Sequence, residues 1–156
     1  MEEAEYIAET LKLARTNIDS GKGGPFGALI VKDGNIISRA ANSVTIKNDP
    51  TAHAEIEAIR KACEELNTFD LSGCILYASC EPCPMCFSAI YWAHIDRVYF
   101  ASNKDKAAEA GFDDQYIYDQ LQQKAELRAV PMAEVKHPDA GREFILWNES
   151  GNKIPY

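Results

Sequence analysis

Apolar residues recur along the chain with two periods, and these periods predict helices that alternate with short strands. Near the start of the chain the spacing is three to four positions, which indicates a helix with one buried face. The expected buried stripe of that helix is Ala4, Ile7, Ala8, Leu11, Ala14 and Ile18. Apolar runs of strand length follow, and Asp33-Gly34 between the first two is typical of a hairpin turn.

The predicted elements indicate an α/β fold. We expect strands at residues 26–32, 35–44, 74–79, 97–101 and 129–134, and helices at 2–19, 52–66, about 83–93, 104–111, 113–121 and 141–150. A strand–helix–strand order after a hairpin favours a mixed sheet covered by helices. We therefore predict a three-layer α-β-α arrangement around a central mixed five-stranded sheet, with residues 1–156 forming a single domain.

Composition fits one soluble domain in a reducing compartment. The chain has 156 residues, of which 46% are hydrophobic and 26% are charged, and these values are ordinary for a globular protein. The acidic start lacks the features of a signal peptide, and no apolar run is long enough to cross a membrane. We therefore expect no membrane partner. The five cysteines are odd in number and at least two are needed as thiolates, so we also expect the protein to be cytoplasmic.

Charge bears on the choice of partner. The formal net charge is −8, and the sequence has no cluster of Lys or Arg. Nucleic-acid binding draws much of its affinity from cationic contacts with phosphate. A nucleic-acid partner is therefore not expected, and a small uncharged molecule is the better expectation for a substrate.

Three residues have the side chains and the spacing of metal ligands. Cys83 and Cys86 would share one face of a helix that Pro84 begins, and the positive end of that helix favours the thiolate form that binds metal. His53 supplies an imidazole at the start of an earlier helix, with Thr51 as its expected N-cap. Catalytic zinc sites use three protein ligands, whereas structural sites use four. Since the sequence has no second Cys-x-x-Cys and no His-x₃-His, we predict an open Zn²⁺ site.

Glu55 is the candidate general acid and base. On the helical wheel of residues 52–66 it lies within the apolar face, whereas Glu57 falls on the solvated face in reach of Lys61. Burial of an unpaired carboxylate raises its pKa, which suits a group that moves protons near neutral pH. The hypothesis is that zinc activates water, and that Glu55 takes the proton while the oxygen attacks an electrophilic carbon. Glu55 would then pass the proton to a ring nitrogen and help the amine to leave.

Two interpretations without this chemistry stay open. A Cys-x-x-Cys alone is also typical of redox proteins. A non-catalytic zinc scaffold would need a fourth protein ligand, for which Cys80 is the nearest candidate. The combination of His-x-Glu with Pro-Cys-x-x-Cys favours catalysis, because it is the known signature of zinc-dependent nucleobase deaminases, in which the Glu is not a ligand.

Longer segments resemble a known family. A resemblance to the cytidine deaminase superfamily is carried by Thr51-Ala52-His53-Ala54-Glu55 and by Cys80-Glu81-Pro82-Cys83-Pro84-Met85-Cys86. A closer resemblance, to the bacterial guanine deaminase branch of this superfamily, is carried by Gly24-Pro25-Phe26-Gly27-Ala28, by Ala110-Gly111-Phe112-Asp113-Asp114 and by the terminal Tyr156. The resemblance implies a cytidine deaminase-like fold and the zinc-dependent hydrolysis of guanine to xanthine and ammonia, a reaction of purine metabolism.

The same resemblance implies roles for individual residues. One Zn²⁺ per subunit would be held by His53, Cys83 and Cys86, with Glu55 as the proton carrier. The implied purine pocket contains Phe26, Asn42, Ala54, Trp92, Asp114 and Tyr156. A homodimer is also implied, in which the segment from about 130 to 156 is exchanged between subunits.

Guanine fits part of this implied pocket chemically. Its N1–H and its exocyclic amine are donors that a carboxylate such as Asp114 can accept, and Phe26 and Trp92 offer flat faces for stacking. Related substrates remain alternatives, because guanosine, cytosine and cytidine would undergo the same chemistry. A tRNA adenosine deaminase shares the zinc motifs, although the acidic charge of the chain argues against it.

Overall fold

The computed structural model describes residues 2–156, which divide into two compact units. The first unit extends to Asp114 and contains a sheet with helices on both faces. The second unit runs from Gln115 to Tyr156. The first unit confirms the α/β class and the α-β-α layers that the sequence predicts.

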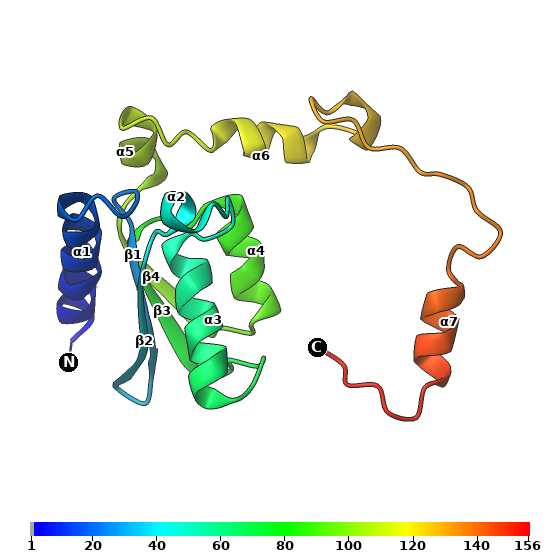
Figure 1. The fold of residues 1–156 in the computed structure, drawn as a ribbon, viewed down its shortest axis with the longest axis horizontal. Helices are drawn as coiled ribbons and strands as arrows, with labels where there is room; N and C mark the ends of the chain where they lie inside the picture. The colour runs from blue at the N-terminus through cyan, green and yellow to red at the C-terminus, as the bar shows by residue number, and fades with distance from the viewer. Residues whose placement is uncertain (1) are drawn as a thin grey trace. The chain divides into compact units, whose positions relative to one another are not determined.

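The sheet is mixed, as predicted (Figure 1). Its strands are β1 (Gly27–Lys32), β2 (Asn35–Ala41), β3 (Cys74–Cys80) and β4 (Arg97–Ser102). Within the described residues they form one four-stranded sheet in the order β2-β1-β3-β4. β1 pairs antiparallel with β2 and β3, whereas β3 and β4 run parallel. The carboxyl ends of β3 and β4 therefore meet at one edge of the sheet, where Cys80 and Ser102 are paired.

The hairpin between β1 and β2 turns at Asp33-Gly34, as predicted. The φ angles of these residues are 49° and 74°, and positive φ at both central positions is the type I′ geometry that matches the twist of paired strands. The hydroxyl of Tyr6 donates a hydrogen bond to the Gly34 carbonyl at 2.7 Å. This bond attaches α1 (Glu3–Asp19) to the turn.

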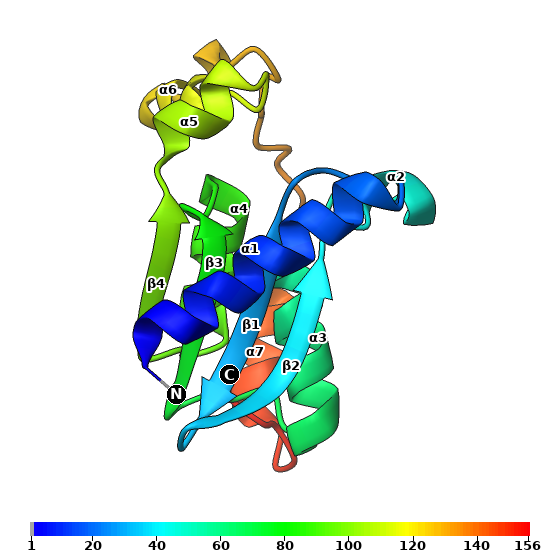
Figure 2. The same ribbon diagram turned by 90° about the vertical axis from the view of Figure 1, so that its left-hand side faces the viewer.

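Helices cover both faces of the sheet (Figure 2). α1 packs on one face, against a cluster that contains Tyr6, Leu29, Val31 and Tyr77. α3 (Ala54–Leu66) and α4 (Pro84–Trp92) pack on the other face. Alternate residues of β1 serve the two faces, since Leu29 and Val31 point to α1 while Ala28 and Ile30 point to α3 and α4.

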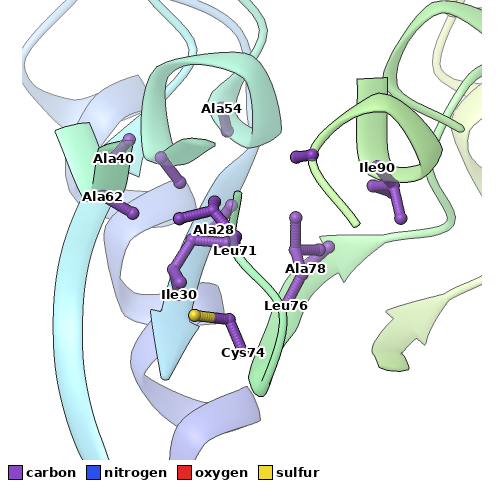
Figure 3. Close-up of a cluster of buried hydrophobic side chains, with 12 residues drawn as sticks. Ala28, Ile30, Ala40, Ala54, Ala62, Leu71, Cys74, Leu76, Ala78 and Ile90 are labelled. Atoms are coloured by element: carbon purple, nitrogen blue, oxygen red, sulfur yellow. The ribbon is translucent and has the colours of Figure 1, made fainter. Parts of the chain in front are cut away.

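The core beneath α3 and α4 consists largely of alanine (Figure 3). Its buried members are Ala28, Ile30, Ala40, Ala54, Ala58, Ala62, Leu71, Cys74, Leu76, Ala78, Ile90 and Ala93. Protein interiors are close-packed, so small side chains at a contact bring the backbones on either side close together. α3 is therefore held tightly against the sheet.

The buried face of α1 differs from the predicted stripe. The buried residues of this helix are Tyr6, Thr10, Ala14 and Asn17. Of the predicted stripe only Ala14 is buried, and Ile18 is 55% exposed. A close approach of two backbones selects this face, because a Cβ atom on Gly27 would lie 2.4 Å from the carbonyl oxygen of Thr10. The face is therefore set by small and hydrogen-bonded residues rather than by the most apolar ones.

The prediction of a strand at residues 129–134 is wrong. This segment is irregular and follows the short 3₁₀ helix η1 (Ala125–Leu127). Pro131 has no N–H to donate to a neighbouring strand, and the N–H of Met132 bonds back to the carbonyl of Ala125 at 3.2 Å. The segment thus turns on itself, and the sheet of the described residues has four strands rather than five.

The second unit has no core of its own. It contains α6 (Gln115–Gln122) and α7 (Arg142–Glu149), and none of its described residues is buried. Its exposed large apolar side chains include Leu121, Val130, Phe144, Ile145, Leu146 and Trp147. No helix in residues 2–156 combines the length and the apolar character that a transmembrane segment requires.

Glu57 is buried, contrary to the prediction of a solvated position. Its side chain is 6% exposed and forms ion pairs with Lys47 and, at 3.0 Å, with Arg60. Lys47 lies in α2 (Val44–Lys47), a short helix that the sequence did not predict. Lys61, the expected partner, donates instead to a backbone carbonyl of β2. Glu57 therefore joins the segment before α3 to the body of that helix.

We expect Glu57→Gln to lower the free energy of unfolding by about 1 kcal/mol at neutral pH, because it removes the charge from both ion pairs but keeps the shape. Burial raises the pKa of Glu57, but its hydrogen-bonded ion pairs with Lys47 and Arg60 outweigh burial and hold the pKa below 4.5. A carboxyl group with a lowered pKa stabilises the fold above its unfolded pKa and loses that contribution as pH falls. Urea unfolding should show the wild type and the variant converging below pH 4.5. A difference that is constant with pH would contradict the ion-pair explanation.

Candidate metal centre

Two helix starts present the predicted metal ligands. His53 is the N-cap residue of α3, and Cys83 is the N-cap residue of α4, with Cys86 in the first turn of that helix. Pro84 opens α4, as expected for a residue whose missing N–H has no partner at the first helical position. Thr51 is not the N-cap, contrary to prediction; its N–H and hydroxyl both donate to the Asp49 carboxylate instead.

The three ligand atoms have the spacing of a tetrahedral zinc site. Nδ1 of His53 lies 3.5 Å from Sγ of Cys83 and 3.6 Å from Sγ of Cys86. Zinc bonds of about 2.0–2.1 Å to nitrogen and about 2.3 Å to sulfur, at a tetrahedral angle, would separate the two atoms by about 3.6 Å. Among the described residues these three form the one cluster of His, Cys, Asp or Glu that could hold a metal ion. The donor set therefore fits Zn²⁺ and leaves one tetrahedral position open.

The charges of the ligands favour a cation between them. The hydrogen bond from Cys86 lowers the pKa of the Cys83 thiol to about 4, and the bond with His53 adds to this effect. The Cys83 thiolate in turn raises the pKa of His53 and that of Cys86. Two thiolates in one buried site repel each other, so a divalent cation is needed to hold both in the ionised form.

Glu55 lies beside the metal ligands as a buried carboxyl group. It is 7% exposed, and burial raises its pKa to about 7. Its side chain interacts with the Cys86 thiol. The sequence places Glu55 within the apolar face of α3, and the structure bears this out. A carboxyl group with a pKa near neutrality can both take up and release a proton.

Cys80 is separate from the ligand cluster. Its Sγ donates to the Asn103 carbonyl at 3.7 Å, and burial raises the pKa of its thiol to about 11. A neutral thiol that is engaged with a backbone carbonyl is not a metal ligand. The candidate fourth ligand of a zinc scaffold is thus directed elsewhere, which favours the open site.

Four residues of the predicted purine pocket lie in the first unit, one in the first turn of α3 and three in loops. Ala54 is fully buried in the first turn of α3. Asn42, which follows β2, is 8% exposed. The ring of Phe26 packs edge-to-face against Phe112, with centroids 4.9 Å apart. Burial raises the pKa of Asp114, and the charge of Cys83 adds to this effect.

Trp92 and Tyr156 are placed differently from the other predicted pocket residues. Trp92 ends α4, six residues after the ligand Cys86, so at 1.5 Å per residue it lies about 9 Å along the helix from that ligand. Its side chain is 64% exposed. Tyr156 belongs to the second unit. The contact of either residue with a substrate therefore stays a prediction.

Glu81 lies in the same motif as the cysteine ligands, but its sequence pattern predicts no role for it. Its Oε2 accepts a hydrogen bond from the N–H of Lys104 at 3.0 Å, and its own N–H donates to the carbonyl of Ser102 at 2.8 Å. These bonds attach the loop before Cys83 to the first turn of α5 (Lys104–Glu109), the helix that precedes Asp114. The partners are more than twenty positions apart in the sequence, so no local pattern could reveal them.

Comparison with known proteins gives a family match and full-length relatives. The family model for the cytidine and deoxycytidylate deaminase zinc-binding region matches residues 1–102. Guanine deaminase of Bacillus subtilis (strain 168) is 48% identical over 156 residues, which are 100% of both chains. The X-ray structure of guanine deaminase from Bacillus subtilis superposes with a TM-score of 0.98 and covers 100% of this chain and 99% of that one.

Two further relatives match only part of this chain. A solved mutant protein in complex with 8-azaguanine has a TM-score of 0.70 at 34% identity, covering 72% of this chain and 65% of its own. A tRNA-specific adenosine deaminase of Aquifex aeolicus (strain VF5) is 46% identical over 97 residues, which are 62% of this chain and 64% of that protein.

Proposed function

The chain belongs to the cytidine and deoxycytidylate deaminase family, and from that premise we propose that it hydrolyses guanine to xanthine and ammonia at a zinc site. The observation that carries the reaction is the meeting of His53, Cys83 and Cys86 at zinc-ligand distances beside the buried Glu55. The full-length identity to a guanine deaminase favours guanine as the base.

The three ligands would hold zinc through one imidazole nitrogen and two thiolates. Zinc supplies Lewis acidity, which makes a water molecule nucleophilic near neutral pH. The ligands come from the N-terminal ends of two helices packed on one face of the sheet, so the fold itself brings the three side chains together. The open fourth position leaves room for water or substrate.

Glu55 would carry the protons of the reaction. Its carboxylate takes a proton from water while the water oxygen bonds to the purine carbon that bears the amino group. The protonated Glu55 then donates to the adjacent ring nitrogen. Its carboxylate next takes the proton of the added hydroxyl group and passes it to the amine, so that the C–N bond breaks, ammonia leaves and the carbonyl group of xanthine forms. The atoms balance as guanine plus water giving xanthine plus ammonia.

The remaining pocket residues would select the base. Asp114 can accept hydrogen bonds from the N1–H and the amino group that guanine presents together, and adenine and cytosine lack this pair of donors. Phe26, with Phe112 fixed against its ring, offers an aromatic face. Asn42 has a side-chain amide that can bond a ring atom.

A tRNA adenosine deaminase is the second candidate function. The identity to the Aquifex aeolicus protein favours it. The net charge of −8 argues against it, because binding a tRNA relies on cationic contacts with phosphate. The match also ends well short of the full chain, whereas the guanine deaminase match does not.

Ammonia release by the zinc-loaded protein tests the function directly. We expect turnover of guanine and none of guanosine, adenine, cytosine or a tRNA anticodon stem-loop. Turnover of another substrate would keep the zinc chemistry and reject guanine. If the zinc-bound protein releases no ammonia from any of these substrates, the scaffold interpretation is favoured.

Variants at neighbouring acids sharpen this assay. Asp114→Asn should raise the KM for guanine. The NH₂ group of the asparagine is a donor, so it cannot accept the hydrogen bond that guanine donates to the Asp114 carboxylate. Asp113→Asn is the matched control, since it makes the same change one residue earlier and should leave the KM within about twofold. Equal effects of the two variants would reject Asp114 as the residue that reads the base.

We further propose that the protein is a cytoplasmic homodimer in which the segment from about 130 to 156 is exchanged between subunits. Residues 115–156 expose many large apolar side chains and bury none. Such a segment is expected to pack against another protein surface that removes these side chains from water. The acidic chain with five free cysteines fits a reducing compartment. Exchange would bring Tyr156 of one chain to the metal centre of the other.

Mixing two inactive variants tests the exchange. We expect Glu55→Gln and Tyr156→Ala each to be poorly active, and a refolded mixture to recover about a quarter of wild-type activity. Half of the dimers would then be mixed, and each would hold one site with Glu55 from one chain and Tyr156 from the other. Without exchange every site keeps one defect, and the mixture stays inactive. Normal activity of Tyr156→Ala alone would contradict its role in the site.

A further inference from the structure

The side chain of Asn17 connects α1 to the loop before β1 and to the loop after β2. It is 6% exposed, and its Nδ2 donates to the Gly24 carbonyl at 2.8 Å and to the Asn42 carbonyl at 2.9 Å. Both hydrogens of the amide are thereby used. Neither the metal motifs nor the implied purine pocket includes this residue.

The two loops are also bonded to each other. The N–H of Asn42 donates to the carbonyl of Phe26 at 3.1 Å, and the N–H of Ser43 donates to the carbonyl of Ala52 at 2.9 Å. The second bond leads to the residue before the metal ligand His53. Asn17 therefore stands at the base of a short chain of hydrogen bonds that reaches the metal centre.

The packing around Asn17 leaves no space for adjustment. A Cβ atom on Gly23 would lie 2.3 Å from the carbonyl oxygen of Asn42 and 3.0 Å from Nδ2 of Asn17. Only a glycine fits at such distances. The backbone of Asn42 is thus held from two sides, by the amide of Asn17 and by the chain at Gly23.

The orientation of the Asn42 side chain follows from its partners. Its Oδ1 accepts from the N–H of Val44 at 3.2 Å and, more weakly, from the N–H of Gly24 at 3.4 Å. Backbone N–H groups are donors only, so the atom that they contact must be the amide oxygen. The NH₂ group of Asn42 is then the end that remains to meet a ligand, and it can bond an acceptor atom of a purine ring.

We propose that Asn17 is a positioning residue for the base: through the backbone of Asn42 and Gly24 it sets the Asn42 amide with its NH₂ group toward the substrate. The proposal rests on the proposed function, because it takes Asn42 as a substrate contact. Asn17 acts from the face of the sheet opposite α3 and α4, and it touches neither metal nor substrate itself.

A double-mutant cycle tests the proposal. The variants are Asn17→Ala, Asn42→Ala and the double variant, each with zinc content measured, and the readouts are the KM and kcat for guanine and the inhibition constant of xanthine. We expect Asn17→Ala to raise both the KM and the inhibition constant about tenfold, with kcat within about twofold and zinc retained. In the Asn42→Ala background the effect of Asn17→Ala should vanish, because its target is gone.

Tyr6→Phe is the matched control. It also removes a hydrogen bond that a buried α1 side chain makes to a loop carbonyl, the bond from Tyr6 to Gly34 at 2.7 Å. It should lower stability and leave the KM unchanged. If Asn17→Ala does not fold, Asn17→Ser replaces it, because serine keeps one hydrogen-bond donor. We expect Asn17→Ser to raise the KM for guanine and the inhibition constant of xanthine by a smaller factor.

The outcomes separate this inference from the proposed function. Additive effects in the cycle, or an unchanged KM in Asn17→Ala while Asn42→Ala raises it, would overturn the positioning role and leave guanine hydrolysis in place. No effect of Asn42→Ala itself would overturn the substrate contact on which the inference rests.

Discussion

Replacing Glu55 with Gln is expected to lower kcat for guanine by about 10²–10⁴-fold, the usual contribution of a positioned general acid and base. Gln has nearly the same shape but neither takes up nor releases a proton at neutral pH. The side chain is buried beside the metal ligands, so no solvent base can easily replace it. The measurement is steady-state ammonia release at saturating guanine.

Zinc content controls the interpretation of that variant. Glu55 is not among the three clustered ligands, so Glu55→Gln should keep one Zn²⁺ per subunit by elemental analysis. A variant that retains both zinc and near-normal turnover would remove Glu55 from the mechanism. Loss of zinc together with activity would instead make it part of the metal site.

The second large effect is expected at the cysteines. Cys83→Ser and Cys86→Ser should each lose most of the bound zinc and about 10³-fold or more of the activity, because the metal supplies several kcal/mol of transition-state stabilisation. The Cys83 thiol has a pKa lowered to about 4, and a serine hydroxyl in its place does not ionise. Zinc analysis and turnover of the same purified samples check both losses.

Cys80→Ser is the matched control within the same motif. Cys80 lies three residues before Cys83, but its Sγ faces the Asn103 carbonyl, to which a serine hydroxyl can also donate. Zinc content and activity should therefore stay near those of the wild type. If Cys80→Ser loses zinc as Cys83→Ser does, the site has four protein ligands and the scaffold interpretation gains the support.

The metal ligands could be predicted because each part of the motif is local. Cys83 and Cys86 are three residues apart, and Pro84 between them marks the start of the helix. Glu55 stood out because a carboxylate within an apolar stripe needs a reason. What the spacing could not supply is the meeting of His53 with the cysteines, thirty positions away, since that depends on how the helices pack on the sheet.

The errors have a common physical cause in contacts between distant segments. Asn17 and Thr10 are polar, so an apolar stripe on α1 could not include them, yet hydrogen bonds or a close backbone approach bury both. The sequence predicts a solvated Glu57 because its partner Lys47 lies in a helix that has only four residues. Four residues carry too little periodicity to be recognised.

The predicted fifth strand illustrates the opposite error, in which local composition misleads. Residues 129–134 include Val130 and Met132, which suit a strand, but the segment belongs to a unit without a buried residue. A strand needs a neighbour to satisfy its backbone groups, and the segment satisfies one of them through its own turn at Ala125.

The alanine core under α3 has a consequence for how this enzyme family can diversify. Positions such as Ala54, Ala58 and Ala62 already carry nearly the smallest side chain, so almost every substitution there adds volume and forces the helix away from the sheet. Substitutions at these alanine positions therefore cannot easily change the shape of the site. We therefore expect new substrate preferences to arise in the adjoining loops, at the proposed pocket residues Asn42 and Asp114, rather than in the helix that carries Glu55.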